Sequence, residues 1–283
     1  MTSMGTTTIP HQKHLFGDLN ERKIFSSYLD VPNVPHKIRL ICEMIADIDS
    51  RSLEVSLDSA WDTVTQLEVE QVLKLSYCFP LSVSVFFRWA GGVLGHKHSR
   101  LSWDLMVDIL GKNFLFAPMW DAIKSMRRLQ MASLITFVSV FNSYMNAGKV
   151  REAILTFEVM DRYGCTRDVV ALNWLICAIC TGGETRYAAD FLRKVKYRIR
   201  PNGDTFALLL EGWEKEHDVV NAKQAFEEMV TEIGWNRDNV CSYEAYLCTV
   251  LGGPDGLAEA VKHLSYCGQR VLPRSTLLYS CIE

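Results

Sequence analysis

Cys177 and Cys180 form a C-x-x-C pair, the spacing at which two thiolates bind one zinc ion. A structural zinc site needs four ligands, and the sequence has no second C-x-x-C and no paired histidines at a suitable distance. Both cysteines lie in an apolar run that is predicted to form a helix, where thiols commonly pack in the core. The pair therefore predicts helix packing, and we expect neither a metal nor another cofactor.

Two glycine-rich segments share only composition with phosphate-binding loops. Thr181 to Glu184 is not followed by Gly-Lys-Ser/Thr, and Gly91 to Gly95 lacks the strand and the acidic partner of a dinucleotide site. The H-x-E and P-C-x-x-C motifs of zinc deaminases are absent, and the seven histidines are scattered. We therefore expect no catalytic residues and no enzyme activity.

One basic cluster precedes Pro201, at the end of a predicted helix. Its cations can contact phosphates, with a salt-dependent contribution to binding. They can equally complement the negative end of the helix dipole. Both interpretations stay open for this cluster, which consists of Arg193, Lys194, Lys196, Arg198 and Arg200.

The composition describes a chain that can bury a sizeable core, with 48% hydrophobic and 22% charged residues. The formal net charge of −3 provides no general attraction to phosphate, so nucleic-acid binding would depend on specific contacts. Nine cysteines without a secretory signal fit a reducing compartment. Charged residues interrupt the apolar stretch from Leu101 to Leu115, so we expect no membrane-spanning segment.

Apolar residues recur along the chain at a spacing of 34 to 37 residues. The fourth, seventh, eighth and eleventh residues of each unit lie on one face of a helix, because the α-helix has a period of 3.6 residues. Each unit is therefore predicted to open with an amphipathic helix. The units start at Arg100, Leu134, Val169, Gly203, Val240 and Ser275, and their fourth residues are Trp103, Phe137, Leu172, Phe206, Tyr243 and Leu278.

A second helix is predicted in each unit after a short turn. In the unit from Leu134, the residues Asn146 to Gly148 interrupt the first helix, and a second helix from Val150 to Arg162 stops at Gly164. A helix pair of this size cannot bury its apolar face alone, so the pairs must stack on one another. The sequence therefore predicts an all-α fold, an α-solenoid, whose hand the residues alone leave open.

The chain divides into a polar start, a helical lead-in and a repeat array. Residues 1–35 fit either a disordered terminus or a weak organellar transit segment, since residues 1–17 have no acidic side chain and several Ser and Thr. Pro32 and Pro35 mark a boundary, and ordered structure is expected to begin near His36. We assign 36–99 to degenerate amino-terminal helical repeats, 100–133, 134–168, 169–202, 203–239 and 240–274 to five repeats, and 275–283 to the start of a sixth.

In the unit from Leu134, Thr136-Phe137 opens a first helix, Ala147 to Ala153 forms the turn, and Phe157-Glu158-Val159-Met160 closes the second helix. This stretch and two others resemble pentatricopeptide repeats. The unit from Gly203 repeats the pattern with Asp204-Thr205-Phe206 and Ala225 to Met229, and Phe86 to Gly91 is similar to the amino-terminal repeats of plant proteins of the pure-repeat subgroup. The resemblance extends from about Val64 to Glu283.

The nearest alternative is a tetratricopeptide array, which also stacks helix pairs but generally binds peptides. Tetratricopeptide units hold a strict length, whereas the units here drift in length, and the W-x2-L-G-x2-Y signature is missing. The sequence therefore favours the pentatricopeptide interpretation.

The resemblance implies a right-handed superhelix whose first helices line a groove for single-stranded RNA, one base per repeat. In such arrays the fifth and last residues of a repeat face the base edge, and the second packs against the base plane. Here Asn173 with Asn202 matches a well-formed recognition pair, whose amides can donate to and accept from a pyrimidine edge. The fifth residues are Asp104, Val138, Asn173, Ala207 and Glu244, the last residues are Ser133, Asp168, Asn202, Asn239 and Arg274, and Ile135 and Val170 are branched second residues.

The other positions depart from the family pattern. Val138 and Ala207 have no side-chain hydrogen-bonding group, and Asp104 or Glu244 brings negative charge toward an anionic ligand. Asp238 can replace Asn239 as the last residue of its longer repeat. Polar residues at helix starts also commonly serve as caps, which is the alternative role for each of these side chains.

The resemblance implies an RNA-binding protein of the mitochondrion, or alternatively the chloroplast, that acts in transcript processing, stability or translation by occupying RNA. A protein-binding scaffold and a degenerate array without a ligand are the alternatives. The sixth unit presents Leu277, Leu278, Tyr279 and Ile282 without a partner helix, so a protein partner or self-association through this carboxyl-terminal edge is also expected.

Overall fold

The computed structural model describes residues 27–234, 240–253 and 256–268, and every regular element of these ranges is helical. The predictions for Asn239, Arg274 and residues 275–283, and for most of the polar start, lie outside the described residues. The helices are α1 (His36–Asp47), α2 (Ser50–Ala60), α3 (Gln66–Leu75), α4 (Pro80–Val93), α5 (Arg100–Lys112), α6 (Phe116–Arg128), α7 (Leu134–Asn146), α8 (Val150–Val159), α9 (Val169–Thr181), α10 (Thr185–Val195), α11 (Gly203–Lys215), α12 (Val219–Ile233), α13 (Val240–Leu251) and α14 (Gly256–Gly268).

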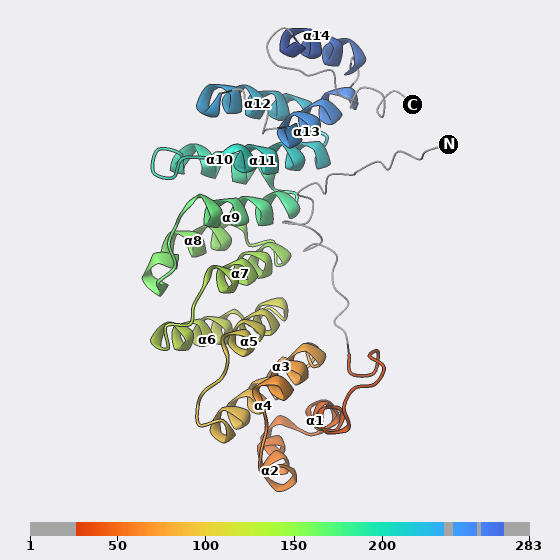
Figure 1. The fold of residues 1–283 in the computed structure, drawn as a ribbon, viewed down its shortest axis with the longest axis vertical. Helices are drawn as coiled ribbons and strands as arrows, with labels where there is room; N and C mark the ends of the chain where they lie inside the picture. Colours follow the sequence, from red (N-terminus) through yellow and green to blue (C-terminus); the bar gives the residue numbers. More distant parts are fainter. Residues whose placement is uncertain (1–26, 235–239, 254–255, 269–283) are drawn as a thin grey trace, which may run out of the picture.

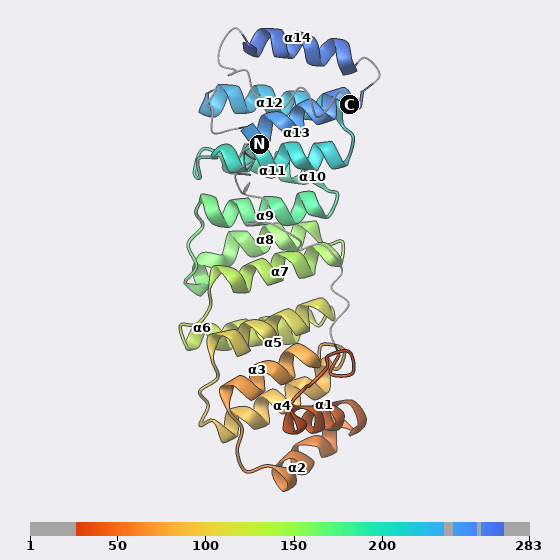
Figure 2. The same cartoon turned by 45° about the vertical axis from the view of Figure 1, so that its right-hand side comes forward.

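Successive helix pairs stack along the long axis of the molecule, from α1 and α2 at one end to α14 at the other (Figures 1 and 2). The first helices α3, α5, α7, α9, α11 and α13 contact one another in chain order, and each also contacts the second helix of its own pair. Because each pair packs mainly on its neighbours, the molecule is elongated (Figure 1). The predicted all-α solenoid is confirmed.

The first helices begin at Arg100, Leu134, Val169, Gly203 and Val240, the residues at which the sequence units start. A polar side chain precedes most of these starts and accepts a hydrogen bond from an otherwise unpaired backbone N–H of the first turn. Ser99, Asp168 and Asn202 cap α5, α9 and α11 in this way, and Thr65 and Ser133 form capping boxes at α3 and α7.

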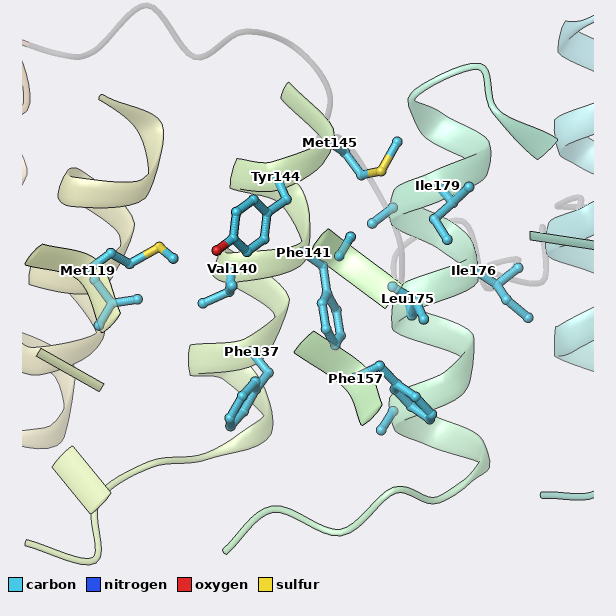
Figure 3. Packing of buried hydrophobic residues seen from close by; sticks show 14 of the residues in the cluster. Met119, Phe137, Val140, Phe141, Tyr144, Met145, Phe157, Leu175, Ile176 and Ile179 are labelled. Carbon is cyan, nitrogen blue, oxygen red and sulfur yellow. The ribbon is translucent and has the colours of Figure 1, made fainter. Parts of the chain in front are cut away.

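The apolar columns form the core between neighbouring pairs. In Figure 3, Phe137, Val140 and Phe141 of α7 lie between Met119 of α6 and the facing side of α9. Most members of the four columns are buried, while Trp103 and Leu247 are half-buried at the edge of the core. Stacking therefore buries the apolar stripes that a single helix pair leaves in water.

Small residues allow neighbouring first helices to approach closely. A Cβ atom added to Gly111 of α5 would overlap the side chain of Ser143 on α7, with the Cβ of Ser143 only 2.8 Å away. Gly212 of α11 meets Cys180 of α9 and Thr185 of α10 in the same manner, with the Cβ of Cys180 at 3.0 Å. Any larger side chain at Gly111 or Gly212 would have to push the stacked pairs apart.

The second helix of the unit from Leu134 is shorter than predicted. The α-helix α8 ends at Val159, and Met160–Tyr163 continues as a 3-10 turn rather than as α-helix to Arg162. Gly164 then takes a left-handed conformation, with φ of +83°, and its backbone N–H bonds to the carbonyls of Met160 and Asp161. The stop at Gly164 is as predicted, but the tightened last turn has no signature in the sequence.

The amino-terminal helices extend the same stack. Helix α1 begins at His36, as expected, and α3 packs on α5 in the way that α5 packs on α7. Val69, Val72 and Leu73 of α3 occupy the fourth, seventh and eighth positions counted from Gln66, and all three are fully buried. The segment from Gln66 to Ser99 therefore has the length and the buried pattern of the unit that follows it.

Candidate functional site

A row of exposed aliphatic side chains marks the first turns of successive first helices. Leu101, Ile135 and Val170 are the second residues of α5, α7 and α9, and they are 44%, 67% and 51% exposed. Leu67, the second residue of α3, is 64% exposed. Because these side chains contribute little to the core, they form a candidate contact surface at equivalent positions of four successive first helices. We call these four residues the aliphatic row.

Asn173 and Asn202 meet beside this row. The Nδ2 of Asn173, on α9, donates to the Oδ1 of Asn202, the cap of α11, at 3.1 Å. Asn173 is only 5% exposed, and its Oδ1 accepts a hydrogen bond of 2.6 Å from the hydroxyl of Thr205. The structure therefore brings together the two amides that the sequence analysis paired.

Asn202 also has a structural role, as the alternative interpretation expected. Its Oδ1 accepts from the backbone N–H of Thr205 at 3.0 Å, which caps α11. Its Nδ2 donates to the carboxylate of Asp204 at 3.2 Å. The side chain of Asn202 is thus held in place by its hydrogen bond to the first turn of α11, and the residue is half-buried.

Asp104 lies at the equivalent place on α5, with a carboxylate instead of an amide. Its Oδ1 accepts a hydrogen bond of 2.6 Å from the hydroxyl of Thr136, which belongs to the capping box of Ser133 at the start of α7. Asp104 is 8% exposed, and this burial raises the pKa of its carboxyl, against the opposing effects of the Thr136 hydrogen bond and the positive charge of Arg100.

The remaining predicted positions are less developed. Val138 is half-buried. The Oδ1 of Asp168 accepts a hydrogen bond of 2.9 Å from the backbone N–H of Ala171, which caps α9. Ala207 and Glu244 are half-buried, but their partner positions, Asn239 and Arg274, lie outside the described residues. Asn173 with Asn202 is therefore the pair of predicted site residues that the described structure joins directly.

One further pair was missed by the sequence analysis. The hydroxyl of Ser99 donates to Oε1 of Glu70 at 2.6 Å, which repeats the junction contact one unit earlier, between α3 and α5. The signal was available, because counting back one unit from Arg100 places Leu67 and Glu70 at the second and fifth positions. Pro80 hid this unit, because a proline commonly ends a helical pattern, whereas here it begins α4.

The basic cluster is partly neutralised within the protein. Lys196 Nζ contacts Glu228 at 2.8 Å and Glu232 at 2.7 Å on α12, and Arg193 pairs with Asp190 at 2.7 Å. Lys194, Arg198 and Arg200 are exposed. Two of the five cations therefore serve the packing of α10, in part against α12, rather than a ligand.

Cys177 and Cys180 pack on α9, and the part of the chain that the structure describes contains no group of three or more potential metal ligands. Burial raises the pKa of both thiols, which keeps them protonated. They border a small hollow of about 70 Å³ between α9 and α11, away from the Asn173–Asn202 pair. Across the described ranges, no helix has the length and apolar character needed to span a bilayer.

The stacked helix pairs and the exposed face of their first helices define a helical-repeat protein of the solenoid class. No family model matches the sequence. The chain is 31% identical over 191 residues to the mitochondrial pentatricopeptide repeat-containing protein At1g77360 of Arabidopsis thaliana, covering 68% of this chain and 37% of that protein. The mitochondrial relative At3g22670 of the same plant is 30% identical over 52% of this chain and 27% of its own length. The chain belongs to the pentatricopeptide repeat family.

Comparison with solved structures agrees with this fold. The crystal structure of the pentatricopeptide repeat protein PPR10 from maize superimposes with a TM-score of 0.59 and 16% identity, covering 89% of this chain and 36% of the maize protein. A structure of PPR10 with an 18-nucleotide psaJ RNA element gives a TM-score of 0.44. The chain spans little more than a third of the length of At1g77360 and of PPR10.

Proposed function

We propose that this chain binds single-stranded RNA through the exposed face of its first helices, as a non-catalytic protein of the pure-repeat subgroup. Bases would pack between successive side chains of the aliphatic row, and their edges would face the fifth and last residues of the repeats. The relatives from Arabidopsis that carry mitochondrial names favour a mitochondrial location over the chloroplast.

The observation that supports this proposal best is the joined amide pair of Asn173 and Asn202 beside Val170. Two amides in contact offer both a donor and an acceptor, and a uracil or cytosine edge needs both. The hydrogen bond between the amides, at 3.1 Å, holds the buried Asn173 and the half-buried Asn202 in a fixed arrangement before a base arrives. Exchange of this bond for bonds to a pyrimidine leaves no polar group unpaired.

Charge indicates how the RNA is held. With a formal net charge of −3, the chain attracts phosphates weakly, so base packing and base-edge contacts would supply most of the affinity. The mechanism that follows is occupancy. A bound solenoid shields its RNA segment from nucleases and from base pairing, which affects transcript processing, stability or translation.

The test is filter binding of the purified chain to a random pool of single-stranded RNA at two salt concentrations. We expect saturable binding with a shallow salt dependence, because few phosphates are neutralised. Sequencing of the retained RNA should show a pyrimidine at one fixed position. Absence of binding at both salt concentrations would refute the proposal and leave a peptide-binding scaffold or an array without ligand.

A further inference from the structure

Exposed cations gather where the second helices end and the next first helices begin. The connections from α6 to α7, from α8 to α9 and from α10 to α11 lie on the same long edge of the array in both views (Figures 1 and 2). Two of them are in contact, because the guanidinium of Arg127 lies over the ring of Tyr163, with Cζ 5.6 Å from the ring centroid. We call this surface the basic edge, and its exposed cations are Arg127, Arg128, Arg162, Lys194, Arg198 and Arg200.

The protein does not neutralise these charges. Within the described ranges, no carboxylate forms an ion pair with a cation of the basic edge, and the nearby acids have other partners: Asp161 pairs with Arg167, and Asp190 with Arg193. The turns of the opposite edge, which join α9 to α10 and α11 to α12, carry more acids than bases, namely Glu184, Glu214, Glu216 and Asp218 against Arg186 and Lys215. A chain with a net charge of −3 therefore keeps a local excess of positive charge on one edge.

The segment after α10 also presents an aromatic ring. Lys196 is held by its ion pairs with α12, Ile199 packs against the core and Pro201 is buried, while the residues between them are exposed. Tyr197 is 87% exposed, and the Nζ of Lys196 lies 5.7 Å from the centroid of its ring. The inward-facing residues thus hold this segment in one conformation, with Tyr197 and Arg198 pointing to solvent.

The helix dipole does not account for the whole edge. Helix α10 ends at Val195, so Arg198 and Arg200 lie beyond the last turn, where the effect of the dipole falls off. The carbonyl of Val195 already accepts hydrogen bonds from the backbone N–H groups of Arg198, at 2.8 Å, and Ile199, at 2.9 Å. The dipole therefore explains cations inside the helices, such as Lys194, but not the side chains of Arg198 and Arg200.

Arginine and tyrosine side chains together suit an unpaired polynucleotide. A guanidinium group donates two parallel hydrogen bonds to a phosphate, and an exposed tyrosine ring stacks on a base of any identity. Base pairing would hide the base faces from Tyr197, so the strand must be single. An anionic membrane is the less suitable partner, because interfacial binding needs a broad apolar face and this edge presents mainly guanidinium groups.

We propose that the basic edge is a second RNA contact, which holds a single-stranded flank of the bound RNA by its phosphates and stacks one unpaired base on Tyr197. This inference goes beyond the proposed function, because the contact lies outside the aliphatic row and reads no base. It rests on that function only in taking the flank to belong to the same RNA. The salt dependence of binding should then increase with the length of the RNA.

The experiment compares two random pools of single-stranded RNA with the purified full chain. A pool of about 8 nucleotides is short enough to stay on the face of the first helices, whereas a pool of about 30 nucleotides can also reach the basic edge. Filter binding over a series of salt concentrations gives the slope of log affinity against log salt. The short pool should keep a shallow slope, and the slope of the long pool should be steeper by about 2, the contribution of about three phosphates on a single strand.

Neutral variants test the cations. K194Q/R198Q/R200Q should return the slope of the long pool to that of the short pool and weaken the long pool about tenfold at low salt. The affinity of the short pool should not change. The matched control R51Q/R151Q/R186Q removes the same charge from the exposed second residues of α2, α8 and α10, at the starts of second helices, and should keep the steeper slope.

Variants of Tyr197 test the stacked base. Tyr197→Ala should weaken binding of the long pool about tenfold without changing the slope, because no charge is lost. Tyr197→Phe keeps the ring and should bind like the unmodified protein. Equal affinities for all three proteins would refute the stacking contact. Circular dichroism melting of every variant distinguishes lost binding from lost folding.

The outcomes separate this inference from the proposed function. Equal slopes for the two pools, or a steeper slope that K194Q/R198Q/R200Q retains, would refute the basic edge and leave the face of the first helices standing. Binding of the long pool alone, abolished in that variant, would support the edge and refute the face. If neither pool binds, both are refuted. Equal slopes combined with variant-sensitive binding to vesicles of about 30% anionic phospholipid would assign the edge to a membrane instead.

Discussion

The hydroxyl of Thr136 donates a hydrogen bond of 2.6 Å to Oδ1 of Asp104, across the boundary between two successive helix pairs. Both residues are buried, and Thr136 at the same time accepts a hydrogen bond from the backbone N–H of Ser133 at 3.1 Å. The side chain of Thr136 thus links the start of α7 to Asp104, the fifth residue of α5. The contact joins stability of the stack to the chemistry of the exposed face.

Thr136→Val should remove this link while keeping the shape of the side chain. We expect the free energy of unfolding to fall by about 2 kcal/mol, because a buried carboxylate loses its donor. The pKa of Asp104 should rise further from its ordinary value, since the hydrogen bond favours the charged form. Urea denaturation measures the first change, and NMR titration of the carboxyl carbon measures the second.

Thr231→Val is the matched control, because Thr231 is an exposed threonine of α12 whose hydroxyl donates to the carbonyl of Glu227, within its own helix. Its effect on unfolding should stay within about 0.5 kcal/mol. Equal losses in the two variants would contradict a special role for the Thr136–Asp104 bond.

Gly111→Ala should destabilise the array, although alanine is the better helix former. The added Cβ overlaps Ser143, so α5 and α7 must separate, at a cost of about 1–3 kcal/mol. Gly92→Ala provides the comparison, because a Cβ at that position in α4 meets no described atom within 4 Å beyond its chain neighbours and the backbone of its own helix. It should stabilise the protein by up to about 1 kcal/mol.

Thermal unfolding of both glycine variants tests this packing. Ser143→Gly removes the side chain that the new methyl group meets, so it should restore part of the stability that Gly111→Ala loses. A Gly111→Ala protein as stable as the Gly92→Ala protein would show that the close approach of the two helices is not required.

His98 should make stability depend on pH. Its ring stacks on Phe87 with ring centroids 3.8 Å apart, its Nε2 lies 2.8 Å from the carbonyl oxygen of Phe87, and burial lowers the pKa of the imidazole. The folded state therefore favours neutral His98, whereas the unfolded chain binds a proton below a pH of about 6.5. Stability is complete above that pH and falls as the pH decreases toward the lower pKa of the folded state.

His98→Phe should reduce this acid sensitivity, because phenylalanine keeps an aromatic ring beside Phe87 but does not titrate. The measurement is the difference in free energy of unfolding between the two proteins across the acid range, which cancels the other histidines. A constant difference from neutral pH down to about pH 5 would contradict the assignment.

Asn173→Ala should weaken the preference for a pyrimidine at its subsite while leaving total RNA affinity within about tenfold. Asn202 needs a different change, because it also caps α11. Asn202→Ser keeps a capping oxygen but removes the amide, so folding should be retained while selectivity falls. Selection from a random RNA pool followed by sequencing compares the variants, and an unchanged pyrimidine preference in both would refute the pair.

Periodicity made the array predictable, since the fourth-position column from Phe137 to Phe206 and the starts of the first helices follow directly from apolar spacing. The side-chain network did not follow, because it depends on contacts between units. Thr136 bonds to Asp104, and Thr205 bonds to Asn173, in the preceding helix pair. To predict these contacts one must know the rise and rotation between successive pairs, and the spacing of residues along one helix does not give them. Glu70 was overlooked for a different reason, since counting back one unit from Arg100 would have placed it at a fifth position.

The dual use of the last residue in each unit limits how this protein can change its target. The last residues of successive units each cap the start of a helix, and in the proposed function the same side chains face the bases. They are Thr65, Ser99, Ser133, Asp168 and Asn202. Only a short side chain with an oxygen acceptor can both cap the helix and face a base. The choice of residue at these positions is therefore limited to about four amino acids, Ser, Thr, Asp and Asn. Redesign for other bases should therefore vary the fifth residues, which cap no helix themselves, but each replacement must keep an acceptor for the hydroxyl that it meets, such as those of Thr136 and Thr205.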